Sequence, residues 1–175
     1  MKRYRLIFGL IFMMAVGGHR LQAADHPDFS GIWIPDLNAQ ESTSIAAILE
    51  AQGASRIEQK AADTLSVTQV LTQTEKTLTI KADSALSTRT QVLQLDGSAQ
   101  TQDTNRVGKI EFKSYWDKDG KTLITVSRLI TSDGQKAEWT LRRYLQDKGR
   151  TMIVDHLFTL EDGRKISGKR VLRKQ

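Results

Sequence analysis

Alternating apolar and polar residues run through most of this 175-residue chain. Within residues 109–116, Ile110, Phe112 and Trp116 share one side while charged residues occupy the other. A period of two residues is typical of a strand that buries one face. The same pattern predicts further strands at about 29–34, 65–73, 76–82, 87–95, 121–131, 136–146, 150–160 and 164–173. The chain is therefore predicted to be all-β.

Glycine-containing turns separate the last five of these strands. Asp119-Gly120, Asp133-Gly134, Lys148-Gly149 and Asp162-Gly163 recur at intervals of 14, 15 and 14 residues. Such pairs between strands indicate hairpins, because glycine accepts the positive φ of a tight turn. Consecutive hairpins favour an antiparallel up-and-down barrel of about eight to nine strands without an exposed edge, with a two-sheet sandwich as the alternative. The polar residues 98–107 are expected to form a loop.

One segment after the first predicted strand has a helical pattern instead. Residues 43–62 are rich in alanine and in glutamate or glutamine, and Ile45, Ile48 and Leu49 are spaced as on one helix face. Ser44 or Thr43 can cap the helix, and Gly53 is expected to interrupt it. This short helical insert either packs against the barrel or forms a lid over its mouth.

The N-terminus has the three parts of a signal peptide. Basic residues precede an apolar run at 6–16, and small residues follow, which predicts cleavage after Ala23 or Ala24. The predicted mature domain is then residues 24–175, in the periplasm of a Gram-negative bacterium or secreted. The apolar run is about half the roughly 20 residues that a membrane span needs, so no transmembrane segment is expected after cleavage. The chain has no cysteine, so packing alone must stabilise the domain.

Cleavage also changes the charge. The leader carries four cations and no acid, so its removal lowers the formal net charge from +6 to +2. Six cations follow the last acid, Asp162, and either protect an edge strand or form a patch for an envelope component. They are Arg164, Lys165, Lys169, Arg170, Arg173 and Lys174. Export argues against nucleic acid as a partner, and the oligomeric state stays open.

The first predicted strand contains Gly31 and Trp33 in the sequence SGIWI. Together with the strand layout, this Gly-x-Trp resembles the calycin superfamily, specifically lipocalin-like exported bacterial domains. The resemblance implies that Trp33 closes one end of the barrel and that an arginine of the last strand packs over its ring. Arg170 is the candidate, since alternation places it on the side of Ile166 and Leu172. A cation over an indole ring contributes about 0.5–2 kcal/mol.

Few residues in the predicted domain are suited to chemistry. His26 and His156 are its two histidines, so a histidine–cysteine metal cluster is excluded and no cofactor is expected. No serine–histidine–acid arrangement or carboxylate pair is apparent, so an enzyme is not expected. His156 shares a predicted face with apolar residues, and its side chain either points into a cavity or is a core histidine with one polar partner.

Small barrels can hold one apolar or amphipathic molecule, which makes an exported binding protein the favoured function. The lumen is predicted to be lined by Phe112, Trp116, Trp139, Leu141, Val154, His156 and Phe158. The alternative is a filled barrel that binds a protein or envelope polymer through its surface.

Overall fold

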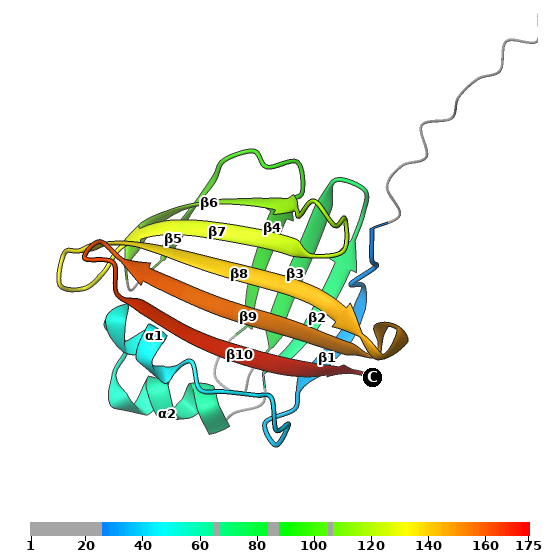
Figure 1. Ribbon diagram of the computed structural model, residues 1–175, viewed down its shortest axis with the longest axis horizontal. Helices are drawn as coiled ribbons and strands as arrows, with labels where there is room; N and C mark the ends of the chain where they lie inside the picture. The colour runs from blue at the N-terminus through cyan, green and yellow to red at the C-terminus, as the bar shows by residue number, and fades with distance from the viewer. Residues whose placement is uncertain (1–25, 65–66, 84–87, 105–106) are drawn as a thin grey trace, which may run out of the picture.

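A computed structural model describes residues 26–64, 67–83, 88–104 and 107–175, so the predicted signal peptide, 1–23, lies outside the described residues. Ten antiparallel strands form one sheet that curls into a nearly closed barrel (Figure 1). Their order in the sheet is β4-β3-β2-β1-β10-β9-β8-β7-β6-β5. The predicted all-β antiparallel barrel with a helical insert is confirmed, and the sandwich is not formed.

The strand bounds follow the alternation closely. They are β1 (Gly31–Pro35), β2 (Thr68–Gln73), β3 (Thr77–Asp83), β4 (Thr88–Gln94), β5 (Gln100–Thr104), β6 (Gly108–Trp116), β7 (Leu123–Ile130), β8 (Lys136–Gln146), β9 (Thr151–Leu160) and β10 (Lys165–Lys174). Nine of these strands were predicted, and β5 was not. A loop was expected at the position of β5, and that expectation was wrong. Its sequence, QTQDT, has no apolar alternation, and pairing with β6 alone makes it a strand.

The barrel has a seam between β4 and β5, which form no ladder with each other. The side-chain amide of Gln100 spans this seam. Its Nε2 donates to the carbonyl of Val92 at 3.0 Å, and its Oε1 accepts from the backbone N–H of Gln94 at 2.7 Å. A glutamine side chain thus replaces a peptide group in the ladder. A barrel without exposed edges was expected. At this seam, side-chain hydrogen bonds close the barrel in place of a strand ladder.

Two helices, α1 (Ala46–Ala51) and α2 (Arg56–Thr64), follow β1 and lie beside the start of β10 (Figure 1). Ser44 Oγ accepts the N–H of Ala46 at 2.9 Å, and Gly53 separates the helices with a φ of 81°. The side chain of Ile48 is fully buried, whereas α2 has no buried residue. No helix in the described ranges is long and apolar enough to cross a membrane.

The start of the insert lies directly on β10. A Cβ atom added at Gly168 would lie 2.8 Å from both Ile45 Cγ2 and Ser44 O. The absence of a side chain at Gly168 therefore lets the segment before α1 approach the inward side of the strand.

The buried apolar residues form two separate clusters rather than one core. The closed-end cluster contains Phe29, Trp33, Leu71, Leu78, Ile80, Leu93, Leu95, Phe112, Leu123, Met152, Val154 and Leu172. The helix-end cluster contains Ile48, Leu129, Ala137, Phe158 and Leu160. Single domains usually have one contiguous core. Between the two clusters here, Leu141 packs against the closed-end cluster and Trp139 against the helix-end cluster, and both are only partly buried.

Trp33 is fully buried in the closed-end cluster, and its Nε1 donates to the carbonyl of Phe29 at 2.8 Å. The cation above its ring is Lys174, whose Nζ lies 5.5 Å from the ring centroid. Arg170, predicted for this position, instead bonds to Asp63. The ladder explains the difference, because Trp33 pairs with Lys174 in the register of β1 and β10.

Candidate functional site

The seven predicted lumen residues all lie on the inward faces of β6, β8 and β9, and the structure divides them into three groups. Phe112 and Val154 belong to the closed-end cluster, and Phe158 is fully buried in the helix-end cluster. Trp139 and Leu141 are half-buried, and His156 lies between the clusters. Whether any of them contacts a ligand stays a prediction.

Trp116 lies at the closed end and not in the middle of the barrel. The ring of His26 stacks on it with centroids 4.2 Å apart and an interplanar angle of 3°. Phe29 lies on it with a centroid distance of 5.9 Å, and His26 Nδ1 bonds to the carbonyl of Gly120 at 2.8 Å. The N-terminal segment therefore plugs this end of the barrel.

The inward-facing residues between the two clusters are incompletely covered. Ser127, Trp139, Leu141 and Arg170 all point inward by their register, yet each is only half-buried. The neighbouring side chains therefore do not fully cover these inward residues. We call this middle layer the lumen.

Arg143 is the most unusual residue at the floor of the lumen. It points inward from β8, opposite Leu123 and Val154, and only 8% of it is exposed. Burial lowers the pKa of its guanidinium to about 10, because the apolar surroundings penalise the charged form. At neutral pH the group is still a cation.

The guanidinium of Arg143 has little to compensate its charge. Its Nη1 donates to Thr125 Oγ1 at a long 3.4 Å, and Thr125 in turn shares a 2.9 Å hydrogen bond with Ser114. No carboxylate of the described residues forms an ion pair with Arg143. Buried charges in proteins are normally paired, so a buried guanidinium without an acidic partner is unusual.

His156 and Trp139 lie side by side above this floor, with ring centroids 5.6 Å apart. His156 Nδ1 and Trp139 Nε1 are buried without a hydrogen-bond partner in the described structure. Burial, and then the charges of Arg143 and Arg170, lower the pKa of His156 to about 3. The histidine is therefore neutral at physiological pH and adds polar atoms, not charge, to the lumen.

Arg170 faces inward on β10 and joins the lumen to the helical insert. Its Nη2 donates to Asp63 Oδ1 at 2.8 Å and to the carbonyl of Ala62 at 2.7 Å, both at the end of α2. Ser44 Oγ donates to the other oxygen of Asp63 at 2.5 Å. Burial works against ionisation of Asp63, but the hydrogen bonds from Ser44 and Arg170 hold its pKa below the usual value. We call this group the insert latch.

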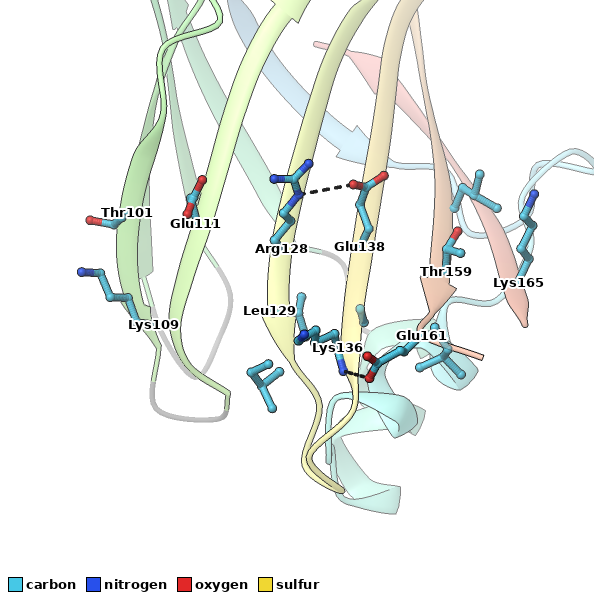
Figure 2. Close-up of a pocket in the computed structure, with 14 residues that line it drawn as sticks. Thr101, Lys109, Glu111, Arg128, Leu129, Lys136, Glu138, Thr159, Glu161 and Lys165 are labelled. Atoms are coloured by element: carbon cyan, nitrogen blue, oxygen red, sulfur yellow. Dashed lines mark hydrogen bonds and ion pairs between the residues drawn. The ribbon is translucent and has the colours of Figure 1, made fainter. Parts of the chain in front are cut away.

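A cavity of about 920 Å³ lies on the outer face of β5–β9 and not in the lumen (Figure 2). Charges of both signs line this outer groove, and Figure 2 shows Arg128 directed toward Glu138, with 3.6 Å between Nε and Oε2. Leu157 and Ile130 are exposed apolar residues of its floor. Because its charges compensate one another, the groove has no strong preference for an anion or a cation.

The cations of the last strand do not form a free patch. Lys169 pairs with Asp155 at 3.6 Å, and Arg173 pairs with Asp36 at 3.1 Å. Arg164 bonds to Asp162, and Arg170 and Lys174 have the internal contacts described above. Four of the six cations predicted as a patch for an envelope component, Arg164, Lys169, Arg170 and Arg173, are thus paired with acids. In the described part of the chain, no group of three or more histidine or acidic side chains could hold a metal ion.

Comparison with solved structures finds the same kind of antiparallel barrel in several proteins. The chain is similar to the REP1-NXSQ fatty acid transporter (TM-score 0.63, 18% identity, covering 85% of this chain and 96% of that one). Human cRBP IV is also similar (TM-score 0.62, 18% identity, 85% and 99%). A Schistosoma mansoni fatty acid binding protein in complex with arachidonic acid matches too (TM-score 0.61, 16% identity, 84% and 96%). Neither a protein-family model nor a curated protein sequence matches the chain.

These likenesses agree with the barrel fold expected from the strand layout and from Gly31 and Trp33. The barrel has ten strands and two helices after the first strand, whereas lipocalins have eight strands. Two of the similar structures are named as a fatty acid transporter and a fatty acid binding protein.

Sequence reasoning did not select Arg143 as a site residue. A signal was nevertheless present, because alternation within 136–146 places Arg143 on the same face as Trp139 and Leu141. A lone cation on a predicted apolar face is worth selecting for this reason. The polar neighbours Ser114 and Thr125 become significant only after strand register brings them together.

Proposed function

We propose that this protein is an exported binding protein that carries an amphipathic, long-chain molecule with an anionic headgroup, such as a fatty acid, inside the barrel. The observation that carries the proposal is the buried, unpaired guanidinium of Arg143. A carboxylate there would supply the counter-charge that the protein lacks. Charge-assisted hydrogen bonds of this kind contribute about 1.5–3 kcal/mol.

The orientation of the bound ligand in the barrel follows from the order of residues along β8. Arg143 lies toward the closed end, and Leu141, Trp139 and Ala137 follow in turn toward the helices. A headgroup at Arg143 would therefore place its hydrocarbon tail along Leu141 and Trp139, ending under α1 and α2. Burial of that tail would contribute about 0.8 kcal/mol per methylene group.

Two further features support a carrier over a filled interaction module. The middle of the barrel is incompletely packed, and the C-terminal cations that would attract a polymer are engaged within the molecule. The basic N-terminal leader with its apolar run supports export to the periplasm or beyond.

Native mass spectrometry of the protein purified from an exported preparation tests this proposal. A co-purified lipid, released on denaturation and containing a carboxylate or other acidic headgroup, is the expected result. Delipidated protein should bind added oleate with one molecule per chain. An apo mass combined with failure to bind oleate would contradict the proposal.

A further inference from the structure

His156 lies on the path between the Arg143 floor and the helix-covered end. It points inward from β9, opposite Leu141 on β8 and Gly168 on β10. Because Gly168 has no side chain, the ring faces backbone on that side, and Ser44 and Ile45 approach the same glycine. His156 as a whole is only 9% exposed and is therefore nearly enclosed.

Positive charge surrounds this histidine on two sides. Arg143 on β8 and Arg170 on β10 are the charged groups that disfavour its protonation, while Trp139 beside it is uncharged. Arg170 is neutralised by Asp63, but no acid of the described residues neutralises Arg143. The outward neighbour Asp155 belongs to the opposite face and pairs with Lys169.

The two ring nitrogens differ in their surroundings. Nδ1 is buried without a partner, whereas Nε2 is not among the buried unpaired atoms. An N–H at Nδ1 would be buried without an acceptor, so the neutral ring is more stable with its hydrogen on Nε2. An acceptor brought by a ligand would then meet an N–H donor.

We propose that His156 is a second headgroup contact and takes up a proton when an anionic lipid binds. This inference rests on the proposed function. An anion at Arg143 would cancel the charge that opposes protonation and would itself favour a cation on the ring. Both changes raise the affinity of the histidine for a proton, and by linkage a lower pH strengthens binding of the anion.

The size of the effect follows from the ordinary behaviour of histidine. If a bound carboxylate returns the pKa of His156 to about 6.5, affinity for the anion rises about tenfold between pH 7.5 and pH 5.5. The binding of an uncharged lipid of the same length would not change, because it leaves Arg143 uncompensated. Selectivity for the anionic ligand would therefore increase in an acidic compartment.

The test is calorimetric titration of the delipidated protein with oleate and with oleyl alcohol, at pH 5.5 and 7.5, in buffers of different ionisation enthalpy. His156→Gln keeps an N–H donor but cannot titrate, and His26→Gln removes the other histidine of the described domain as a matched control. Proton uptake with oleate alone, lost in His156→Gln and retained in His26→Gln, is the expected result.

Two results would overturn the inference. Tight binding of oleate without proton uptake in the unaltered protein would do so while leaving the proposed carrier function intact. Equal uptake in His156→Gln would assign the proton to another group. Failure of oleate to bind at either pH would instead contradict the proposed function itself, and this inference with it.

Discussion

Lys174 lies above the indole ring of Trp33, with Nζ 5.5 Å from the ring centroid, and its side chain crosses Gly31. A Cβ atom at Gly31 would lie 2.5 Å from Lys174 Cε, and the φ of 138° is unfavourable for any other residue. The closed end of the barrel thus depends on a glycine that leaves room for a lysine. A double-mutant cycle can separate this contact from backbone strain.

Gly31→Ala is expected to lower the free energy of unfolding in two ways, by strain and by displacing Lys174 from the ring. In the Lys174→Ala background only the strain remains, so the cost should be smaller by about 0.5–1 kcal/mol, the size of an exposed cation–π contact. Urea denaturation of the four proteins measures this coupling. Additive costs would show that the lysine and the glycine do not interact.

The depressed pKa of His156 predicts acid sensitivity. In the folded protein this pKa is about 3, and in the unfolded chain it is about 6.5, so the unfolded state binds the proton first as pH falls. The stabilising contribution is complete above pH 6.5 and is lost as pH falls from 6.5 toward 3, at about 1.4 kcal/mol per unit of pH. Chemical denaturation of the delipidated protein between pH 7 and pH 4 should show this slope.

His156→Gln removes the titrating group and should flatten that part of the curve. His26→Gln serves as the comparison, because His26 lies outside the lumen. An unchanged slope in His156→Gln would refute the assignment of acid sensitivity to this buried ring.

The insert latch holds a helix that has no buried residue of its own. Asp63→Asn keeps the shape of the side chain but removes the charge that pairs with Arg170. Because about a third of Asp63 is exposed, the loss of stability should be small, about 1 kcal/mol. The equilibrium constant for local opening of α2 should therefore increase more than the equilibrium constant for global unfolding.

Hydrogen exchange monitored by mass spectrometry can detect this opening. Amides of residues 56–64 should exchange faster in Asp63→Asn, while Asp162→Asn, which removes an exposed pair with Arg164, should leave them unchanged. If α2 keeps its full protection in Asp63→Asn, the latch does not hold the helix.

Arg143 is expected to lower the free energy of unfolding of the ligand-free protein. Replacing it with methionine removes a buried cation without removing a counter-ion, so Arg143→Met should raise the free energy of unfolding of the delipidated domain by about 1–3 kcal/mol. Arg128→Met on the outer face should change it by less than about 0.5 kcal/mol. Thermal melting of both variants provides the comparison. A marked loss of stability in Arg143→Met would mean that its contacts with the protein already compensate the charge.

The strands with one apolar face could be predicted from the sequence, since burial imposes a two-residue period on them. β8 was predicted with the bounds Lys136–Gln146 that the structure gives. β5 could not be predicted, because it borders the seam and Gln100 bonds to backbone instead of packing in a core. The sequence of β5 contains Gln100, which closes the seam, but it lacks the apolar–polar alternation that identifies a strand.

Site residues were harder to predict because they depend on register between distant strands. The cation above Trp33 is Lys174 and not the predicted Arg170. The two residues lie four positions apart on one face of β10, so alternation alone cannot distinguish them. The pairing of Arg170 with Asp63 joins residues 107 positions apart. By contrast, Trp139 and Leu141 were predicted on the inward face correctly, since facing direction is a local property.

The most direct test of the carrier function compares oleate with oleyl alcohol in the unaltered protein and in Arg143→Met, by calorimetric titration at pH 7.5. Oleate is expected to bind with one molecule per chain and more tightly than the alcohol. Arg143→Met should weaken oleate about 10- to 100-fold while leaving the alcohol unchanged, as expected for the loss of one charge-assisted contact. Undiminished oleate binding in Arg143→Met would show that Arg143 does not bind the headgroup and would contradict the proposed carrier function.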